Sequence, residues 1–160
     1  MKKITINTSF SVYPEISKLP LETQQLMKLA IDARKNAYAP YSKFRVGAAI
    51  LLENGKIVIG SNQENAAYPS GLCAERVAIF QAGALYPNIK ISQIAITAAS
   101  DNGKTFEPIP PCGACRQSMA EYESKQKSNL KVYFMGETGE IYLSDSINNL
   151  LPLTFDNSVL

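Results

Sequence analysis

Three cysteines, together with a complete absence of histidine, restrict how this chain of 160 residues can fold. One cysteine stands in a Cys-Ala-Glu element at residues 73–75, and the other two stand in a Pro-Cys-Gly-Ala-Cys element at residues 111–115. Thiolates suit zinc, and a catalytic zinc takes three protein ligands and leaves the fourth position for water. A fold that uses all the cysteines must bring both elements to one point. The candidate ligands of one Zn²⁺ per chain are Cys73, Cys112 and Cys115, with Glu75 close enough to reach the open position.

The absence of histidine also excludes several kinds of catalysis. No Ser-His-Asp triad, Cys-His dyad or histidine-rich zinc site can be built from this chain. A Cys-x-x-Cys pair alone is also typical of a redox site, and a lone cysteine is commonly a buried hydrophobic residue. An odd number of cysteines fits a disulfide framework poorly, which favours a reducing compartment. A purely structural zinc prefers four ligands, so three soft ligands favour a catalytic metal.

Length and composition predict a single soluble domain. Hydrophobic residues make up 46% of the chain and charged residues 19%, as in ordinary globular proteins. The net charge of +2 is too balanced to indicate a surface that follows nucleic-acid phosphates. The longest apolar runs are shorter than the roughly 20 residues of a membrane span, and the basic start does not continue into a signal peptide. We expect no nucleic-acid partner, no membrane association and a cytoplasmic location.

Periodicity and turn signals predict alternating helices and strands. Asn54-Gly55 is a strong hairpin signal between two strands, and the short segment 136–139 allows only an antiparallel hairpin. Ser144 or Asp145 is expected to cap a last short helix that ends at Leu151. Helices are expected at 21–37, 74–84 and 113–124, and strands at 44–52, 56–62, 91–98, 130–135 and 140–143. This order predicts an α/β fold with a mixed sheet covered on both faces.

The first twenty residues differ from the rest of the chain. Ile4, Ile6, Phe10 and Val12 alternate with polar residues, which is typical of an edge strand or an arm. Such a segment extends the sheet or clasps a neighbouring subunit. We therefore expect residues 1–20 to form an N-terminal arm or edge strand and residues 21–160 to form one catalytic domain.

The cysteine elements together carry a family resemblance. A Cys-x-Glu element followed by Pro-Cys-x-x-Cys resembles the signature of the zinc deaminases, in which the glutamate is the acid/base and not a ligand. From about residue 38 to residue 155, the chain resembles the small cytidine deaminases whose zinc ligands are all cysteines. The resemblance implies a three-layer α-β-α fold with a five-stranded mixed sheet. It also implies hydrolytic deamination of cytidine and 2′-deoxycytidine in pyrimidine salvage.

The resemblance further implies roles for individual residues. Glu75 is the catalytic acid/base, and Arg76 hydrogen-bonds to the ligand sulfurs and offsets their charge. Asn62 and Glu64, in the motif Asn-Gln-Glu-Asn-Ala, hold the 3′-hydroxyl of the ribose. The implied contacts to the nucleoside also include Phe44, which stacks on the base, Tyr68, Ala74 and Phe155. In this family the C-terminal phenylalanine reaches the pocket of a neighbouring subunit, so a homotetramer is implied.

Other functions remain possible from the sequence. A nucleic-acid-editing deaminase shares the zinc chemistry, but those relatives insert a helix where this chain has only residues 136–139. A deaminase of aminonucleoside antibiotics, similar to blasticidin S deaminase, uses the same ligand pattern. A zinc-stabilised or redox module without catalysis is the remaining alternative.

Overall fold

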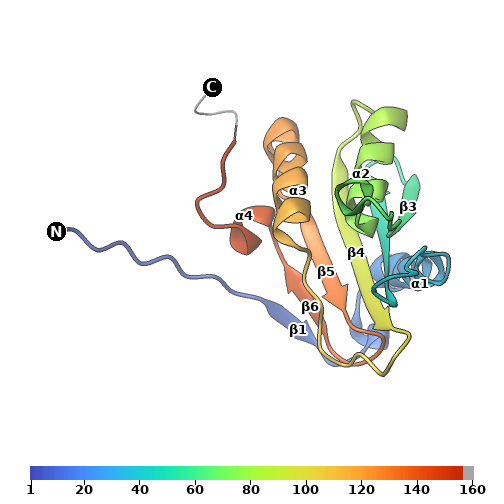
Figure 1. Cartoon of the computed structure of the whole chain (residues 1–160). Helices are drawn as coiled ribbons and strands as arrows, with labels where there is room; N and C mark the ends of the chain where they lie inside the picture. Colours follow the sequence, from blue (N-terminus) through green and yellow to red (C-terminus); the bar gives the residue numbers. More distant parts are fainter. Residues whose placement is uncertain (157–160) are drawn as a thin grey trace.

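The structure is a computed structural model that describes residues 1–156, and it contains one mixed β-sheet flanked by helices (Figure 1). Within the described residues the sheet has six strands in the order β1-β6-β5-β4-β2-β3. The strands are β1 (Ser11–Tyr13), β2 (Phe44–Leu52), β3 (Ile57–Ser61), β4 (Ile91–Ser100), β5 (Lys131–Met135) and β6 (Ile141–Ser144). The helices are α1 (Leu21–Lys35), α2 (Ala74–Leu85), α3 (Gly113–Gln126) and α4 (Ile147–Leu150), with 3₁₀ turns at Ile16–Lys18 and Tyr68–Ser70.

The strand pairing confirms a mixed sheet but corrects the predicted number of strands. β4 and β5 run parallel, whereas the other neighbouring pairs are antiparallel, including the β2–β3 and β5–β6 hairpins. The prediction of five strands is wrong, because β1 pairs with the outer edge of β6 and places Ser11 opposite Leu143. An unpaired edge exposes backbone donors and acceptors, and β1 satisfies part of that edge.

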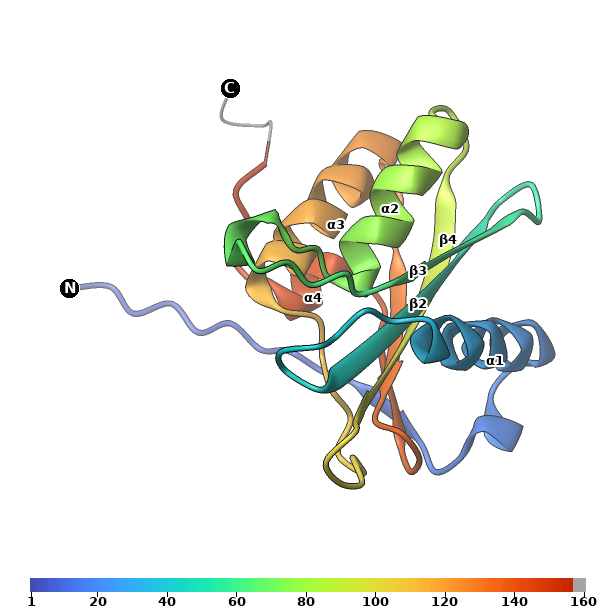
Figure 2. The same cartoon turned by 45° about the vertical axis from the view of Figure 1, so that its right-hand side comes forward.

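Helices cover both faces of the sheet, which gives three layers (Figure 2). On one face, α1 packs Leu26 and Met27 against alternate residues of β2 such as Ala49. On the other face, α2 and α3 pack against the intervening residues, including Ile50. Side chains alternate between faces along a strand, so a strand that is apolar throughout serves both cores. The predicted limits of β2 to β6 and of α1, α2 and α3 lie within two residues of the observed ones.

Two glycines set how closely the helices approach the sheet. A Cβ atom at Gly47 of β2 would lie 2.0 Å from the carbonyl oxygen of Ala30 in α1. A Cβ at Gly60 of β3 would lie 2.5 Å from the carbonyl oxygen of Ala74, the first residue of α2. Only glycine permits such an approach, so Gly60 fixes where the N-terminus of α2 lies against the sheet.

The chain ends lie beyond this core. Residues 1–10 extend away from the body of the molecule and are exposed, although Phe10 contacts Phe134 and Tyr142 with ring centroids 6.2 and 6.3 Å away. The cap of α4 is Ser146, whose side chain accepts a hydrogen bond from the Asn149 amide, so the predicted cap at residue 144 or 145 is wrong. Within residues 1–156 the helices are too short or too polar to cross a membrane.

Candidate metal centre and active site

The two cysteine elements meet at the N-termini of neighbouring helices. Cys73 is the N-cap residue of α2 and Cys112 is the N-cap residue of α3. Cys115 lies in the first turn of α3 and is completely buried. The first amide groups of a helix have no partner within the helix, and the dipole is positive there. Both helix ends therefore stabilise thiolates.

The sulfur atoms have the spacing of a metal site. The Cys73 and Cys112 Sγ atoms are 3.8 Å apart, and the Cys112 and Cys115 Sγ atoms are 3.5 Å apart. All three sulfurs lie within 4.8 Å of one another. Zinc–sulfur bonds of about 2.3 Å in a tetrahedron place neighbouring sulfurs about 3.8 Å apart, whereas a disulfide needs about 2.05 Å. The donor set therefore fits one Zn²⁺.

Neighbouring groups favour negative charge on the sulfur of Cys73. A hydrogen bond from the Cys115 thiol, with help from the Arg76 guanidinium, lowers the pKa of Cys73 to about 5 despite its partial burial. Sharing that proton with Cys73 raises the pKa of Cys115. Arg76 Nη2 lies 3.7 Å from Cys73 Sγ, and its buried Nε has no hydrogen-bond partner among the described residues. Arg76 thus places positive charge beside the sulfur cluster, and its predicted role in offsetting the charge of the zinc ligands stays a prediction.

Glu75 lies beside the sulfur cluster and is almost completely buried, with 4% of its surface exposed. Burial is the main cause that raises the pKa of its carboxyl to about 7, and the negative charge on Cys73 raises this pKa further. A carboxyl with a pKa near neutrality can both accept and donate a proton at that pH. The position and environment of Glu75 suit an acid/base.

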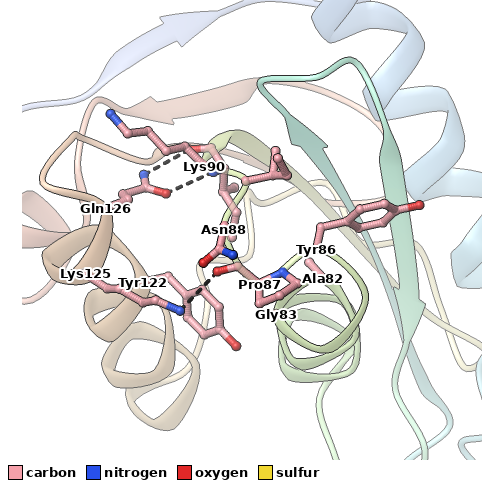
Figure 3. A pocket seen from close by; sticks show the side chains of 11 residues that line it. Ala82, Gly83, Tyr86, Pro87, Asn88, Lys90, Tyr122, Lys125 and Gln126 are labelled. Atoms are coloured by element: carbon pink, nitrogen blue, oxygen red, sulfur yellow. Dashed lines mark hydrogen bonds between the residues drawn. The ribbon is translucent and has the colours of Figure 1, made fainter.

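A cleft of about 510 Å³ opens next to this centre. Cys73 and Arg76 lie on its wall, together with residues from three other segments: 41–42, 62–65 and 68–72. Its volume is within the usual range for sites that bind small molecules. A smaller cavity of about 240 Å³ lies between the C-terminal ends of α2 and α3, near Tyr86 and Tyr122 (Figure 3). It is lined by no cysteine, so it is separate from the metal centre.

Asn62 and Glu64 both line the cleft, and both also bind the backbone of their own chain. Asn62 Oδ1 accepts a hydrogen bond from the Val46 amide, and its Nδ2 donates to the Phe44 carbonyl. Glu64 Oε2 accepts hydrogen bonds from the amides of Tyr41 and Ser42, at 2.9 and 3.3 Å. Hydrogen bonds from this turn lower the pKa of Glu64, which therefore stays ionised at neutral pH.

The other predicted substrate residues occupy different environments. Tyr68 lines the cleft and is 75% exposed, whereas Ala74 is fully buried at the start of α2. Phe44 is half-buried at the first position of β2 and does not line the cleft. Phe155 is exposed and lies outside the cleft of its own chain, where its carbonyl accepts a hydrogen bond from Gln117. The roles of these four residues stay predictions.

Sequence reasoning did not assign two further residues of the cleft wall. The ring centroids of Tyr41 and Tyr68 are 5.9 Å apart, and both residues line the same wall of the cleft. Gln63 exchanges two backbone hydrogen bonds with Leu72, at 2.9 Å each, and so joins two segments of the cleft. Tyr41 stands three residues before Phe44, the predicted base contact, and this proximity was the available signal. The pairing of Gln63 depends only on backbone groups and leaves no mark in the sequence.

A mixed sheet with a three-thiolate zinc site and an adjacent buried carboxylate defines a zinc-dependent hydrolytic enzyme. The protein-family model described as the cytidine and deoxycytidylate deaminase zinc-binding region matches residues 21–130 of this chain. The cytidine deaminase of Halalkalibacterium halodurans is 43% identical over 135 residues, which is 84% of this chain and 95% of that protein. The cytidine deaminase of Sporosarcina psychrophila is 37% identical over 140 residues, which is 88% of this chain and 96% of that protein.

Solved structures lead to the same family. The crystal structure of cytidine deaminase from Burkholderia pseudomallei superposes on this chain with a TM-score of 0.70 and 40% sequence identity. The match covers 82% of this chain and 97% of the Burkholderia pseudomallei chain. The chain therefore belongs to the cytidine deaminase family. The predicted family and the predicted cofactor, one Zn²⁺ per chain held by the three cysteines, are both confirmed.

Proposed function

We propose that this chain hydrolyses cytidine and 2′-deoxycytidine to uridine and 2′-deoxyuridine and releases ammonia. The observation that carries the proposal is the sulfur cluster of Cys73, Cys112 and Cys115 with the buried Glu75 beside it. The relatives at 43% and 37% identity, both named cytidine deaminase, support the same reaction. A nucleoside of this kind belongs to pyrimidine salvage, and a reducing cytoplasm suits three free thiols.

Proton transfer in this reaction falls to Glu75. When bound, zinc supplies a Lewis acid that lets water act as a nucleophile at neutral pH. Glu75 takes one proton from the attacking water and delivers it to N3 of the pyrimidine as the water oxygen bonds to C4. It then passes the second proton to the exocyclic amine, and the C4–N bond breaks to release ammonia. A pKa of about 7 for this carboxyl suits both the uptake and the release of a proton.

The cleft wall supplies the contacts to the sugar. An amide oxygen accepts two hydrogen bonds and an amide nitrogen donates two, so Asn62 keeps one of each after binding the backbone of Val46 and Phe44. Glu64 binds the turn amides through Oε2 and lines the cleft, where its carboxylate can also accept a hydrogen bond from a ribose hydroxyl. We assign the 3′-hydroxyl to these two residues and the face of the base to Phe44. Tyr68 and Ala74 complete the contacts from the same chain.

A second chain completes the cleft in this proposal. Tyr41 and Tyr68 are 48% and 75% exposed on the wall of the cleft, and Phe155 is 62% exposed near the C-terminus. Large aromatic surfaces of this kind mark places where another molecule packs. We propose a homotetramer in which Phe155 of one chain covers the cleft of another. Closed symmetric assembly then shields the reacting groups from water.

The test of the proposed reaction is direct. Cytidine is added to the purified protein, and the fall in ultraviolet absorbance and the ammonia released are followed together. We expect one ammonia per uridine, complete loss of turnover after zinc is removed by a chelator, and recovery when zinc is restored. Zinc-loaded protein that leaves cytidine and deoxycytidine unchanged would refute the proposed function while leaving the metal site in place.

A further inference from the structure

Arg116 joins two parts of the chain that are distant in sequence. It follows the buried ligand Cys115 on α3 and is itself half-buried. Its Nε donates a hydrogen bond of 2.7 Å to the carbonyl of Pro111, the residue before the ligand Cys112. Its Nη1 donates a hydrogen bond of 2.8 Å to the carbonyl of Leu150, the last residue of α4. One planar guanidinium therefore holds the turn before α3 and the end of α4 together.

The two contacts together suit an arginine, because two N–H donors of one rigid group reach two separate carbonyls. The last carbonyls of a helix have no partner within the helix, and α4 is a single turn, so Leu150 needs an external donor. A guanidinium presents several N–H donors in a rigid plane, whereas a lysine ammonium is a single compact charge on a flexible stem. The other contact fixes the peptide between Pro111 and Cys112, which sets the direction of the Cys112 side chain.

Other side chains of α3 hold α4 and the segment after it. The buried Glu123 carboxylate accepts hydrogen bonds from the amides of Ile147 and Asn148 at the start of α4, at 2.9 and 3.3 Å. Gln117 Nε2 donates to the Phe155 carbonyl at 2.8 Å. Of these three residues of α3, Arg116 is the one that also binds the zinc-ligand turn. Movement of α4 can therefore reach the metal site through Arg116.

We infer that Arg116 is a positioning residue that couples retention of zinc to the docking of α4 and the C-terminal segment 150–155. Its two hydrogen bonds fix the ligand turn only while α4 stays in place. Coupling of this kind is reciprocal, so bound zinc also stabilises the docked position of α4. The inference concerns the metal site alone and does not depend on which nucleoside the enzyme uses.

The first experiment measures zinc release to a coloured chelator from zinc-loaded protein. We expect Arg116→Met to release zinc at least about tenfold faster, because a lost hydrogen bond to a charged group is worth about that factor. Arg116→Lys keeps the charge and reaches one carbonyl at a time, so an intermediate rate is expected. Arg45→Met is the matched control, since Arg45 Nη1 also donates to a backbone carbonyl, that of Ala37, away from the cysteines.

A second readout reports the metal geometry itself. Protein loaded with Co²⁺ has thiolate absorption bands, and we expect these to shift in Arg116→Met and to stay unchanged in Arg45→Met. Wild-type spectra and release rates in a folded Arg116→Met variant would overturn the inference. Equal acceleration in Arg45→Met would also overturn it, because a general loosening of the fold would then explain the effect.

A double-mutant cycle tests the coupling to α4 and remains informative if Arg116→Met does not fold, because Arg116→Lys can replace it. Glu123→Gln loosens the start of α4, together with the Leu130 amide that the same carboxylate binds, without touching the ligand turn, and we expect it alone to speed zinc release. In the background of the Arg116 variant, the same change should add little. The coupling would be overturned if Glu123→Gln alone left the rate of zinc release unchanged. It would also be overturned if the rate increases of the two single variants simply multiplied in the double variant.

Discussion

The two halves of the active site differ in how complete they are within one chain. The metal half has a buried base: Cys115 is inaccessible and Glu75 is 4% exposed, whereas Cys73 is half-buried and Cys112 lies at the surface. The substrate half is open, with Tyr68 75% exposed on the wall of the cleft. The difference teaches that the fold of the single chain brings the metal-site groups together by itself, and it is consistent with the proposal that a second chain completes the surface for the nucleoside.

The reason lies in which elements supply each half. The metal half is built from the first turns of α2 and α3, and both helices pack against one face of the sheet. The substrate half comes from the turn around Tyr41 and the segment after β3, where Glu64 and Asn62 hold the backbone by hydrogen bonds. Because Asn62 and Glu64 organise their own loop and are also the proposed sugar contacts, we expect the substrate half to be sensitive to small changes.

The largest expected effect separates catalysis from the assembly of the metal half. Glu75→Gln keeps the size of the side chain but removes the proton carrier, so turnover of cytidine should fall by at least about a hundredfold. Zinc content, measured by elemental analysis, should stay at one per chain because Glu75 is not a ligand. Near-normal turnover in this variant would remove Glu75 from the mechanism.

The next effect concerns the position of the metal half. Gly60→Ala introduces a Cβ 2.5 Å from the Ala74 carbonyl, which must push the start of α2 and Cys73 away from β3. Overpacking of this kind costs about 1–3 kcal/mol or more. We expect a lower melting temperature and faster zinc release. Gly103→Ala is the control, since nothing lies within 4 Å of a Cβ there. If both variants behave alike, the close approach of α2 does not position the ligand.

A smaller and more selective effect is expected in the substrate half. Glu64→Ala removes the proposed partner of the ribose hydroxyl and loosens the Tyr41–Ser42 turn. We expect kcat/KM for cytidine to fall at least about tenfold. Zinc content and any residual action on free cytosine should change little. Equal losses on nucleoside and free base would show that Glu64 does not act through the sugar.

The metal half could be predicted from the sequence because its chemistry requires particular side chains. The thiols of Cys73, Cys112 and Cys115 are the only ones in the chain, and Glu75 stands at a specific spacing from the first of them. The paired strands and long helices were also predictable, since hydrophobic periodicity reports burial on one or both faces. Residues 1–10 and β1 share one alternating pattern, and sequence alone does not say that only Ser11–Tyr13 pairs with the sheet.

Contacts between side chains and backbone were not predictable. Ser144, Asp145 and Ser146 are all good helix caps in succession, and the local geometry selects Ser146. Arg116 binds the carbonyls of Pro111 and Leu150, and every residue has a carbonyl, so nothing in the sequence marks these partners. Likewise, the hydrogen bonds of Asn62 to β2 do not follow from its family role.

One measurement tests the contrast between the two halves most directly: native mass spectrometry, which counts chains and zinc ions in the same particle. Because all three ligands come from one chain, we predict four zinc ions in a four-chain assembly, and one zinc in every monomer obtained by dilution. Because we propose that a second chain completes the substrate half, those monomers should have little cytidine turnover. Monomers that lose their zinc on separation, or that keep full activity as monomers, would contradict this account.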